Sequence, residues 1–452
     1  MKMIDKEEIL KIIKQSGHKK IKFAISDIDG VLRSKIININ NLKSFEEGDA
    51  GLCDVLFGWD VQDKCYDNAT FTGWHTGYPD QKVKLDFSTF RTIPWENNLP
   101  FFLGDLEIKE NGGDIYPRTL LKKINDDCQS SGFQAMFSEE FEWTNFLGNP
   151  NQLEETNYQK LTPITPGMFG YSALRPELFK DYFNELYDFL ADFNIPLEAM
   201  HTETGPGVYE AALVYDKILQ AADKAVLFKE SVKEIAYRHN IIASFMAKWN
   251  KDLPGCSGHI HQSLWDKEGT VNYFSPEMMK KSSVLENYLA GQLLCLPEIL
   301  PMYAPTVNSY KRLTTGSWAP TTVSWGKENR TTAIRYIKDK NSGSRLEIRV
   351  PGSDSNPYLA MAASLASGLY GIKHKLSLKI PETKGSAYDS KEIIPLASDL
   401  TTATEKMKHS SISKELFGEA FVNHFIRTRE WEWKEYSKAI TDWEIKRYLE
   451  II

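Results

Sequence analysis

Cysteine is scarce in this sequence, and its spacing fits neither a disulfide framework nor a zinc site. Five cysteines occur in 452 residues, far apart and without a CxxC pair. An odd number of cysteines with this spacing is typical of free thiols in a reducing compartment. We therefore expect a cytoplasmic protein.

Long apolar segments and basic clusters are also absent. No window approaches the roughly eighteen uncharged apolar residues that a membrane span needs, and the charged segment 1–17 lacks the apolar core of a signal peptide. The formal net charge is −7, and the basic cluster at Lys19, Lys20 and Lys22 is short. We expect neither a membrane nor a nucleic acid as a partner. The sequence also contains no Walker-type phosphate loop and no dinucleotide-binding fingerprint.

The hydrophobicity pattern predicts two domains. In residues 21–37 apolar and polar residues alternate around Asp29-Gly30, which predicts two strands joined by a tight turn. Residues 99–107 form another strand-like run, and the sequence becomes turn-rich near residue 108. We predict a small N-terminal β-rich domain over residues 1–107 and a larger domain over residues 108–452.

The larger domain combines strands with long helices, which makes the fold class α+β. Residues 135–143 have the pattern of a strand, whereas residues 176–194 and 222–240 have that of amphipathic helices. The Ala-rich residues 359–372 are typical of a tightly packed buried helix. These elements predict helices that cover one large sheet, then an exposed loop over residues 376–400 and a helical C-terminal region.

Two glutamates in one strand-like run can bind a cation together. Glu140 and Glu142 flank Phe141, so in a strand they point to one face while Phe141 points into the core. Neighbouring carboxylates repel each other unless a cation lies between them. A solvent-facing strand with ordinary surface acids explains the pair equally well. Glu139 has the opposite phase and is expected to take no part.

Two further segments offer ligands for a divalent metal. Glu203 and Glu210 flank a Gly-Pro-Gly turn that can bring two carboxylates to one ion, although an ordinary surface turn is the alternative. His259 and His261 alternate in a strand-like segment and share a face, although either can be a satisfied core histidine. Carboxylates mixed with imidazole suit Mg²⁺ or Mn²⁺ better than zinc, which favours cysteine and more histidine.

Arginines in the same half of the chain suit an anionic substrate. Arg345 and Arg349 alternate with Glu347, so a strand projects all three side chains to one side. A guanidinium binds phosphate or carboxylate in a bidentate manner that lysine cannot imitate. Surface salt bridges are the alternative for each arginine. Metal ligands beside clustered arginines are what phosphoryl transfer from ATP to a carboxylate requires. The arginines concerned are Arg312, Arg330, Arg335, Arg345 and Arg349.

Read in order, these segments resemble the glutamine synthetase superfamily. The resemblance rests on the order and spacing of EFE, ETGPGVYE, SGHIHQSL, NSYKRL, NRTTAIR and RLEIRVPGSDSNPYLAMAA, and it runs from residue 27 to the end of the chain. It implies a small N-terminal β-grasp domain and a large glutamine-synthetase-type catalytic domain. In that domain a curved antiparallel sheet with flanking helices forms a funnel between neighbouring subunits. The resemblance also implies a homo-oligomeric ring, commonly a dodecamer.

The resemblance also implies the cofactors and the role of each residue. ATP and two or more divalent ions, Mg²⁺ or Mn²⁺, would act at each site. One ion would be held by Glu142, Glu203 and Glu210, and another by Glu140, His259 and Glu347. Arg312 and Arg349 would bind the substrate carboxylate, and Arg330 the transferring phosphoryl group. The nucleotide would contact His261, Ser263, Arg335 and Arg345.

The sequence departs from this family where the amine binds. Members that use ammonia carry a glutamate in a Gly-aromatic-Glu-Ala-Pro flap, and here Trp318 takes its place in GSWAP. An indole cannot accept a proton, but it can form an apolar or cation–π wall for an alkylammonium. The ammonium-site signature Asp-Gly-Ser-Ser is missing. In its nearest counterpart, FGWDVQD, Asp60 is the candidate surviving carboxylate.

Smaller departures agree with this difference. Pro254 and Val208 stand where typical members have Asn and Gln, and a branch of glutamate–polyamine ligases shares the aromatic flap residue and the xxGxDxNPYL variant. That branch is the closer resemblance. The tyrosine that is adenylylated in many bacterial members is not recognisable, because Tyr388 lies in a different context, SAYDS. We do not expect regulation by that route.

These observations predict a ligase that uses ATP to join the γ-carboxylate of glutamate to an amine through a γ-glutamyl phosphate. Trp318 and the missing ammonium motif favour a primary amine or a polyamine. One alternative is a glutamine synthetase that uses ammonia. Another is a non-catalytic ring-forming homologue, which predicts loss of metal ligands, and all six are present.

Overall fold

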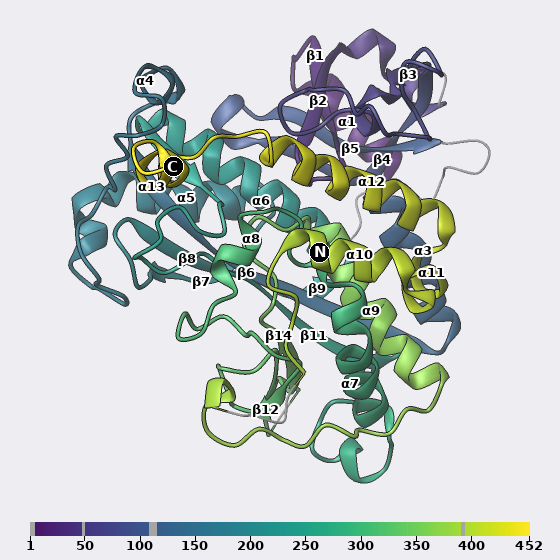
Figure 1. Ribbon diagram of the computed structural model, residues 1–452. Coiled ribbons are helices and arrows are strands. Elements are labelled where there is room, and N and C mark those ends of the chain that lie inside the picture. Colours follow the sequence, from purple (N-terminus) through teal and green to yellow (C-terminus); the bar gives the residue numbers. More distant parts are fainter. Residues whose placement is uncertain (1–4, 48–49, 108–114, 341, 390–393) are drawn as a thin grey trace.

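The N-terminal part of the chain forms a mixed five-stranded sheet. The structure, a computed structural model, describes residues 5–47, 50–107, 115–340, 342–389 and 394–452 (Figure 1). The sheet has the strand order β2-β1-β5-β4-β3, in which β1 and β5 are parallel and the other neighbours antiparallel. Helix α1 (Lys6–Gln15) buries Ile9 and Ile13 in its core. The strands are β1 (Lys20–Ser26), β2 (Leu32–Asn38), β3 (Ala50–Cys53), β4 (Asp80–Ile93) and β5 (Leu99–Glu107).

The turn predicted at Asp29-Gly30 is confirmed. The Gly30 amide donates to the Asp27 carbonyl, and Gly30 has a φ of +84°, which glycine adopts at little cost. The turn packs closely against the start of helix α9, because a Cβ atom on Gly30 would lie 3.1 Å from the Cα of Asn356. Asn356 Nδ2 also donates to the carbonyls of Asp27 and Ile28. This hairpin therefore fixes the N-terminal sheet to the rest of the molecule.

A second, curved sheet carries most of the predicted site residues. Its strands follow the order β12-β13-β14-β11-β6-β8-β7, and β9 and β10 also pair with β6. The pairs are antiparallel except β12 with β13. This α+β arrangement agrees with the predicted fold class (Figure 1). The strands are β6 (Phe133–Leu147), β7 (Leu197–Thr202), β8 (Val208–Leu213), β9 (Asp216–Lys217), β10 (Ile241–Ser244), β11 (Gly258–Asp266), β12 (Trp325–Lys327), β13 (Ile334–Ile337) and β14 (Arg345–Ile348).

Long helices pack together behind this sheet, as predicted. Helix α9 contacts α3, α6 and α7, and it contains the buried Ala-rich segment. It approaches α7 so closely that a Cβ atom on Gly371 would lie 2.0 Å from the Asn287 carbonyl oxygen. The segment predicted to be helical over 176–194 begins with a 3-10 turn before α5. The helices are α3 (Pro117–Ser130), α5 (Lys180–Asp192), α6 (Ile218–Arg238), α7 (Val284–Cys295) and α9 (Pro357–Lys373), and the shorter α2 (Leu42–Glu46), α4 (Pro150–Glu155) and α8 (Ser309–Arg312).

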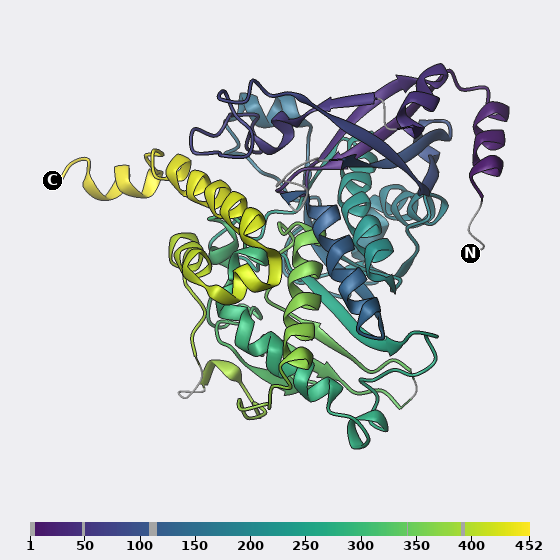
Figure 2. The ribbon, with the colours of Figure 1, turned by 90° about the vertical axis from the view of Figure 1, so that its right-hand side faces the viewer.

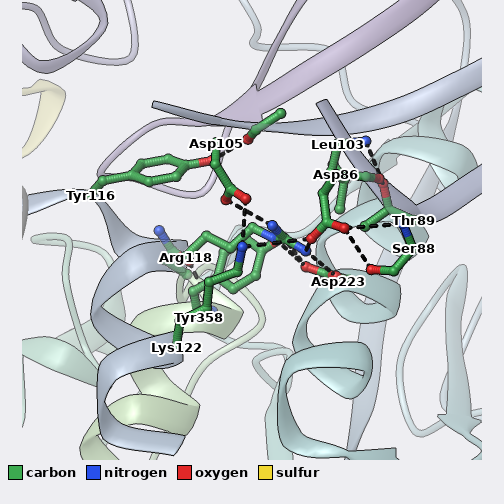
Figure 3. A network of polar contacts seen from close by, with 12 residues as sticks. Asp86, Ser88, Thr89, Leu103, Asp105, Tyr116, Arg118, Lys122, Asp223 and Tyr358 are labelled. Atoms are coloured by element: carbon green, nitrogen blue, oxygen red, sulfur yellow. Dashed lines mark hydrogen bonds and ion pairs between the residues drawn. The ribbon is translucent and has the colours of Figure 1, made fainter. Parts of the chain in front are cut away.

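A buried arginine on helix α3 links the N-terminal sheet to helices α6 and α9 (Figure 3). Arg118 is 1% exposed and donates to both oxygens of Asp223 on α6, at 2.8 Å each. It also donates to Asp105 on β5 at 2.7 Å and to Asp86 on β4 at 2.8 Å. Tyr358 of α9 completes the network by donating to Asp223 at 2.6 Å. One guanidinium thus links the N-terminal strands to the helices behind the second sheet.

The C-terminal region is helical, as predicted. Asn68 and Arg427 exchange hydrogen bonds at 2.9 and 2.8 Å, so helix α12 lies against the N-terminal part. Helix α13 projects away from the body of the molecule (Figure 2). No helix in the described ranges is long and apolar enough to cross a membrane. The helices are α10 (Leu400–His409), α11 (Ser411–Phe417), α12 (Glu419–Tyr436) and α13 (Asp442–Tyr448).

Two further predictions concern connecting segments. The predicted domain boundary at residue 108 falls within residues 108–114, which lie outside the described residues, so the division into 1–107 and 108–452 stays a prediction. Within the predicted loop 376–400, the described residues 376–389 and 394–400 are largely irregular and in large part exposed, as predicted. Ala387 and Leu396 within it are nevertheless buried, at 1% and 8% exposure. This segment therefore packs partly against the body of the molecule.

Candidate active site

The predicted metal ligands line up across three neighbouring strands of the second sheet. Glu140 on β6 lies opposite His259 on β11, and His261 on β11 lies opposite Glu347 on β14. Directly opposed residues of antiparallel strands point to the same face, and so do residues two apart in one strand. The register of the sheet therefore brings these four side chains together.

Distances between these side chains agree with a shared cation. His259 Nδ1 lies 3.4 Å from Glu347 Oε1 and 3.7 Å from Glu140 Oε2. His261 Nε2 lies 3.1 Å from Glu140 Oε1. In the described part of the chain, Glu140, His261 and Glu347 are the group that offers three ligand atoms within 4.8 Å of one another. Either imidazole is thus close enough to the two carboxylates to join them on an ion.

Hydrogen bonding separates the roles of the two histidines. Arg345 Nε donates to His261 Nδ1 at 2.9 Å. A neutral His261 that accepts at Nδ1 carries its proton on Nε2, where it faces Glu140. His259 Nε2 and His261 Nε2 are both buried, and neither makes a well-aligned hydrogen bond within the described residues. The hydrogen bond from Arg345 therefore distinguishes the two rings, and both keep a buried nitrogen close to the carboxylates.

Both carboxylates of this group are ionised at neutral pH. Burial raises the pKa of Glu140, but its interactions with His261 and His259 outweigh burial and hold the pKa well below its ordinary value. Burial likewise opposes ionisation of Glu347, yet Arg349 and the two histidines lower its pKa to about 2. Ionised carboxylates beside a free imidazole nitrogen fit Mg²⁺ or Mn²⁺.

A second acidic group lies beside the first. Glu142 on β6 is paired with Glu210 on β8, and the Glu203 amide donates to the Val208 carbonyl at 2.9 Å to close the predicted turn. Burial raises the pKa of Glu210 to about 7, and the charges of Glu142 and Glu140 add to this effect. Burial and Glu142 raise the pKa of Glu203, and one oxygen of Glu203 is buried without a hydrogen-bond partner among the described residues. Because a cation would relieve the repulsion between these neighbouring carboxylates, the group also fits a metal.

Four of the five predicted arginines surround these carboxylates. Glu347 lies between Arg349 Nη1, which donates to Oε1, and Arg335 Nη1, which lies 3.0 Å from Oε2. Arg312 is 3% exposed, and it donates to the carbonyls of Val350 at 3.0 Å and Arg349 at 3.2 Å. The structure thus gathers Arg312, Arg335, Arg345 and Arg349 on the glutamate and histidine face of the sheet.

The remaining predicted residues lie at the edge of this group. The Arg330 side chain is exposed, while its backbone carbonyl accepts a hydrogen bond from Arg349 Nε at 3.0 Å. Ser263 is buried and accepts a hydrogen bond from the Trp265 indole at 2.9 Å. Trp318 is 67% exposed and has a φ of +60°. The chain therefore leaves the Arg330 and Trp318 side chains open to solvent.

Asp60 is not brought to this site within one chain. Its Oδ2 accepts from the Trp431 indole at 2.9 Å, and its Oδ1 accepts from the amides of Gln62 and Lys64. Asp60 therefore lies against helix α12, where the N-terminal part meets the C-terminal region. None of its contacts in the described ranges involves the glutamates of the sheet.

Sequence reasoning missed two residues beside the acidic groups. His201 Nε2 lies 3.3 Å from Glu210 Oε1, and its hydrogen bond to Glu210 raises the pKa of His201 to about 8. The Tyr171 ring stacks on His201, with centroids 4.4 Å apart. His201 precedes Glu203 by two residues, so the alternation that paired Glu140 with Glu142 also predicts its position. Tyr171 lies in a loop and gives no periodic signal.

The Glu139 side chain points to the opposite face of β6 from Glu140 and Glu142, as predicted. It is fully buried, and neither carboxylate oxygen has a hydrogen-bond partner among the described residues. Burial raises the pKa of Glu139 to about 8, although the charge of Lys229 lowers it. Glu139 is therefore largely protonated at neutral pH and stands apart from the metal-binding face.

Carboxylates, a free imidazole nitrogen and clustered arginines on one face of a curved antiparallel sheet define a class of enzyme, the metal-dependent ligases that activate a carboxylate with ATP. The family model described as glutamine synthetase, catalytic domain, matches residues 114–448. The protein belongs to the glutamine synthetase family, which in general depends on ATP and divalent metal ions. It is an ATP-dependent γ-glutamyl ligase of the glutamate–ammonia or glutamate–amine type.

Several relatives cover nearly the whole chain. A type-1 glutamine synthetase 2 of Dictyostelium discoideum is 48% identical, over 100% of this chain and 88% of the relative. A glutamate–isopropylamine ligase of a Pseudomonas species is 37% identical, over 99% of each chain. A γ-glutamylethanolamide synthetase of Streptomyces coelicolor is 33% identical, over 98% of this chain and 95% of the relative. A solved GmaS/ADP complex shares the fold, with a TM-score of 0.84, 24% identity, and coverage of 98% and 99%.

Proposed function

We propose that the protein joins the γ-carboxylate of glutamate to an organic primary amine or a polyamine. The observation that carries this proposal is Trp318, which stands in the flap where ammonia-using members have a glutamate. Two of the relatives support it. One is named for the amine it joins to glutamate, isopropylamine, and the other for its product, γ-glutamylethanolamide. The five free cysteines support a reducing compartment such as the cytoplasm.

The metal-binding roles follow the two acidic groups. Glu140, Glu347 and His259 would hold one ion, with His261 orienting Glu140, and Glu142, Glu203 and Glu210 would hold another. When bound, the ions neutralise negative charge on the phosphoryl oxygens of ATP. Buried ring nitrogens of His259 and His261 and a buried oxygen of Glu203, all without a hydrogen-bond partner among the described residues, support metal binding by these groups.

The arginines support the first half of the reaction. A carboxylate is a poor acyl donor because its leaving group would be oxide, so a glutamate oxygen first attacks the γ-phosphorus of ATP and ADP leaves. Arg335 and Arg345 would bind the nucleotide phosphates, and Arg330, free to move at the surface, would contact the transferring phosphoryl group. Arg312 and Arg349, held by backbone carbonyls, would fix the glutamate carboxylate.

The flap supports the second half. The amine nitrogen attacks the acyl carbon, phosphate leaves, and the nitrogen loses one proton to a base. Trp318 cannot be that base, but its indole provides an apolar and cation–π surface for the alkyl chain of an ammonium group. Asp60 would approach this site from a neighbouring subunit, because within one chain it lies against α12.

A homo-oligomeric ring, which would bring Asp60 to a neighbouring site, is part of the proposal. The C-terminal segment supports it, because four apolar side chains there are strongly exposed: Ile440 (78%), Trp443 (60%), Leu449 (80%) and Ile451 (84%). Exposed apolar groups clustered in this way are typical of an interaction surface. A dodecamer is the expected assembly.

A glutamine synthetase that uses ammonia is the second candidate. The observation that favours it is the 48% identity to the Dictyostelium relative, whose name is type-1 glutamine synthetase 2. The two functions share the site and differ in the acceptor nitrogen alone.

The proposal is tested by turnover of Mg-ATP and glutamate with separate acceptors. The panel contains ammonium, methylamine, ethylamine, ethanolamine, isopropylamine, putrescine and spermidine, with phosphate release measured and each product identified by mass. The proposal predicts higher kcat/KM for at least one organic amine than for ammonium. Turnover with ammonium alone would establish the second candidate instead.

A further inference from the structure

The structure ties the flap that carries Trp318 to a segment outside the family motifs. The Tyr388 hydroxyl donates a hydrogen bond to the Ala319 carbonyl at 2.9 Å, across 69 residues of sequence. Ala319 directly follows Trp318 and is 1% exposed. The peptide next to the flap indole is therefore held by a distant side chain.

The segment that carries Tyr388 is itself anchored beside the phosphoryl-binding arginine. The Ala387 amide donates to Thr331 Oγ1 at 2.9 Å, and Asn329 Nδ2 donates to the Gly385 carbonyl at 2.8 Å. Asn329 and Thr331 flank Arg330 in the sequence. Tyr388 thus reaches the flap from a fixed base rather than from a free loop.

The phenol of Tyr388 also lies near the arginines assigned to the substrate carboxylate. Burial raises the pKa of Tyr388, while the positive charges of Arg349 and Arg312 lower it. Both arginines are therefore close enough to act on the hydroxyl electrostatically. The Tyr388 hydroxyl therefore contacts the flap and lies within electrostatic range of both arginines.

Two tethers hold the flap, one on each side of Trp318. Ser317 Oγ donates to the Arg312 carbonyl at 2.9 Å, and Tyr388 holds Ala319. Between them Trp318 has a φ of +60°, which is costly for a residue other than glycine and persists only where the surroundings impose it. Trp318 is 67% exposed, so packing against neighbours does little to hold its indole. The backbone tethers therefore decide where the indole stands.

We propose that Tyr388 is a positioning residue for the acceptor amine, whose hydroxyl holds the Ala319 carbonyl and thereby sets the place of the Trp318 indole. This inference rests on the proposed function, since it takes Trp318 to be part of the amine site. Tyr388 makes no hydrogen bond to the glutamates or histidines of the metal groups in the described ranges. Loss of its hydroxyl therefore affects the amine and leaves ATP and glutamate in place.

The test is Tyr388→Phe, which removes the hydroxyl and keeps the ring. Loss of one hydrogen bond of ordinary net strength should raise the KM of the preferred organic amine about threefold to tenfold. The KM values of ATP and glutamate should stay unchanged. The matched control is Tyr215→Phe at an exposed tyrosine (59%), which is expected to change none of them. Because Tyr388 acts through Trp318, Tyr388→Phe should add nothing to Trp318→Ala.

The outcomes separate this inference from the function on which it rests. If Trp318→Ala alters the choice among amines but Tyr388→Phe leaves every amine KM unchanged, the positioning role is wrong and the proposed function stands. If Trp318→Ala leaves the choice among amines unchanged, Trp318 is not part of the amine site and this inference is wrong, whereas the proposed function is decided by the wild-type panel of amines. Weaker binding of ATP and glutamate in Tyr388→Phe would make Tyr388 a general structural residue and overturn the inference.

Discussion

Glu140 and His261 stand on adjacent strands, and His261 Nε2 lies 3.1 Å from Glu140 Oε1. Arg345 fixes the other side of the same imidazole. This arrangement orients an ionised carboxylate toward His259 and Glu347.

Glu140→Gln should abolish most of the metal-dependent activity. The amide keeps the size of the side chain but removes the negative charge that a divalent cation needs, so we expect a loss of about 100-fold or more in kcat. The measurement is glutamate-dependent phosphate release from ATP, together with Mg²⁺ titration followed by thermal stability.

Glu139→Gln is the matched control for this variant. Glu139 is the preceding residue on β6, but burial raises its pKa to about 8, so its neutral form already resembles glutamine. We expect activity within about threefold of the wild type because the side chain lies outside the metal-binding face. Equal losses in both variants would contradict the assignment of Glu140 as a ligand.

Arg118→Met should strongly destabilise the fold. The substitution leaves three aspartates without their buried cation, and breaking a buried charge pair costs roughly 3–5 kcal/mol of unfolding free energy. Urea unfolding followed by circular dichroism measures this change. Arg238→Met is the control, since Arg238 makes a half-exposed ion pair with Glu185 and should change stability by less than about 1 kcal/mol. A similar, small change in both variants would show that the network contributes little.

Much of the site could be predicted from sequence because it depends on alternation within strands. Glu140 with Glu142, and Arg345 with Glu347, lie on one face for that reason, and the turn between Glu203 and Glu210 was recognisable from its glycines. The cross-strand register that sets Glu140 opposite His259 is a property of the folded sheet, so it could not be predicted from local pattern. The position of Asp60 could not be predicted either, because nothing in the local pattern indicates that its carboxylate accepts a hydrogen bond from Trp431 on α12.

His424 should make the folded state less stable as the pH is lowered from 7 to 5, in opposition to buried carboxyl groups such as Glu139 whose pKa is raised. Burial, aided by Arg429 and Arg427, lowers the pKa of His424 to about 4. The unfolded chain, with an ordinary histidine pKa, binds more protons between pH 7 and pH 5, so acid favours unfolding by about 2 kcal/mol from this residue over that range. Relative to the wild type, His424→Phe should raise Tm more at pH 5 than at pH 7, whereas His409→Gln at an exposed histidine should not. An unchanged slope in His424→Phe would contradict this account.

Removal of residues 440–452 should weaken the oligomer. These residues include the strongly exposed apolar side chains of the C-terminal segment, which lack cover in a single chain. Light scattering after size-exclusion chromatography measures the mass of the assembly. Tyr187→Ala at an exposed tyrosine of α5 is the control and should leave the mass unchanged. An unaltered mass after truncation would show that other surfaces hold the ring together.

Competition between acceptors in one reaction shows whether this ligase prefers an organic amine. Purified protein, Mg-ATP and glutamate are supplied with equal concentrations of ammonium, methylamine, ethanolamine, isopropylamine and spermidine, and the products are counted by mass spectrometry. The account predicts that one γ-glutamyl amide of an organic amine exceeds glutamine, and that Trp318→Glu shifts the ratio toward glutamine. Glutamine as the dominant product of the wild type would contradict it.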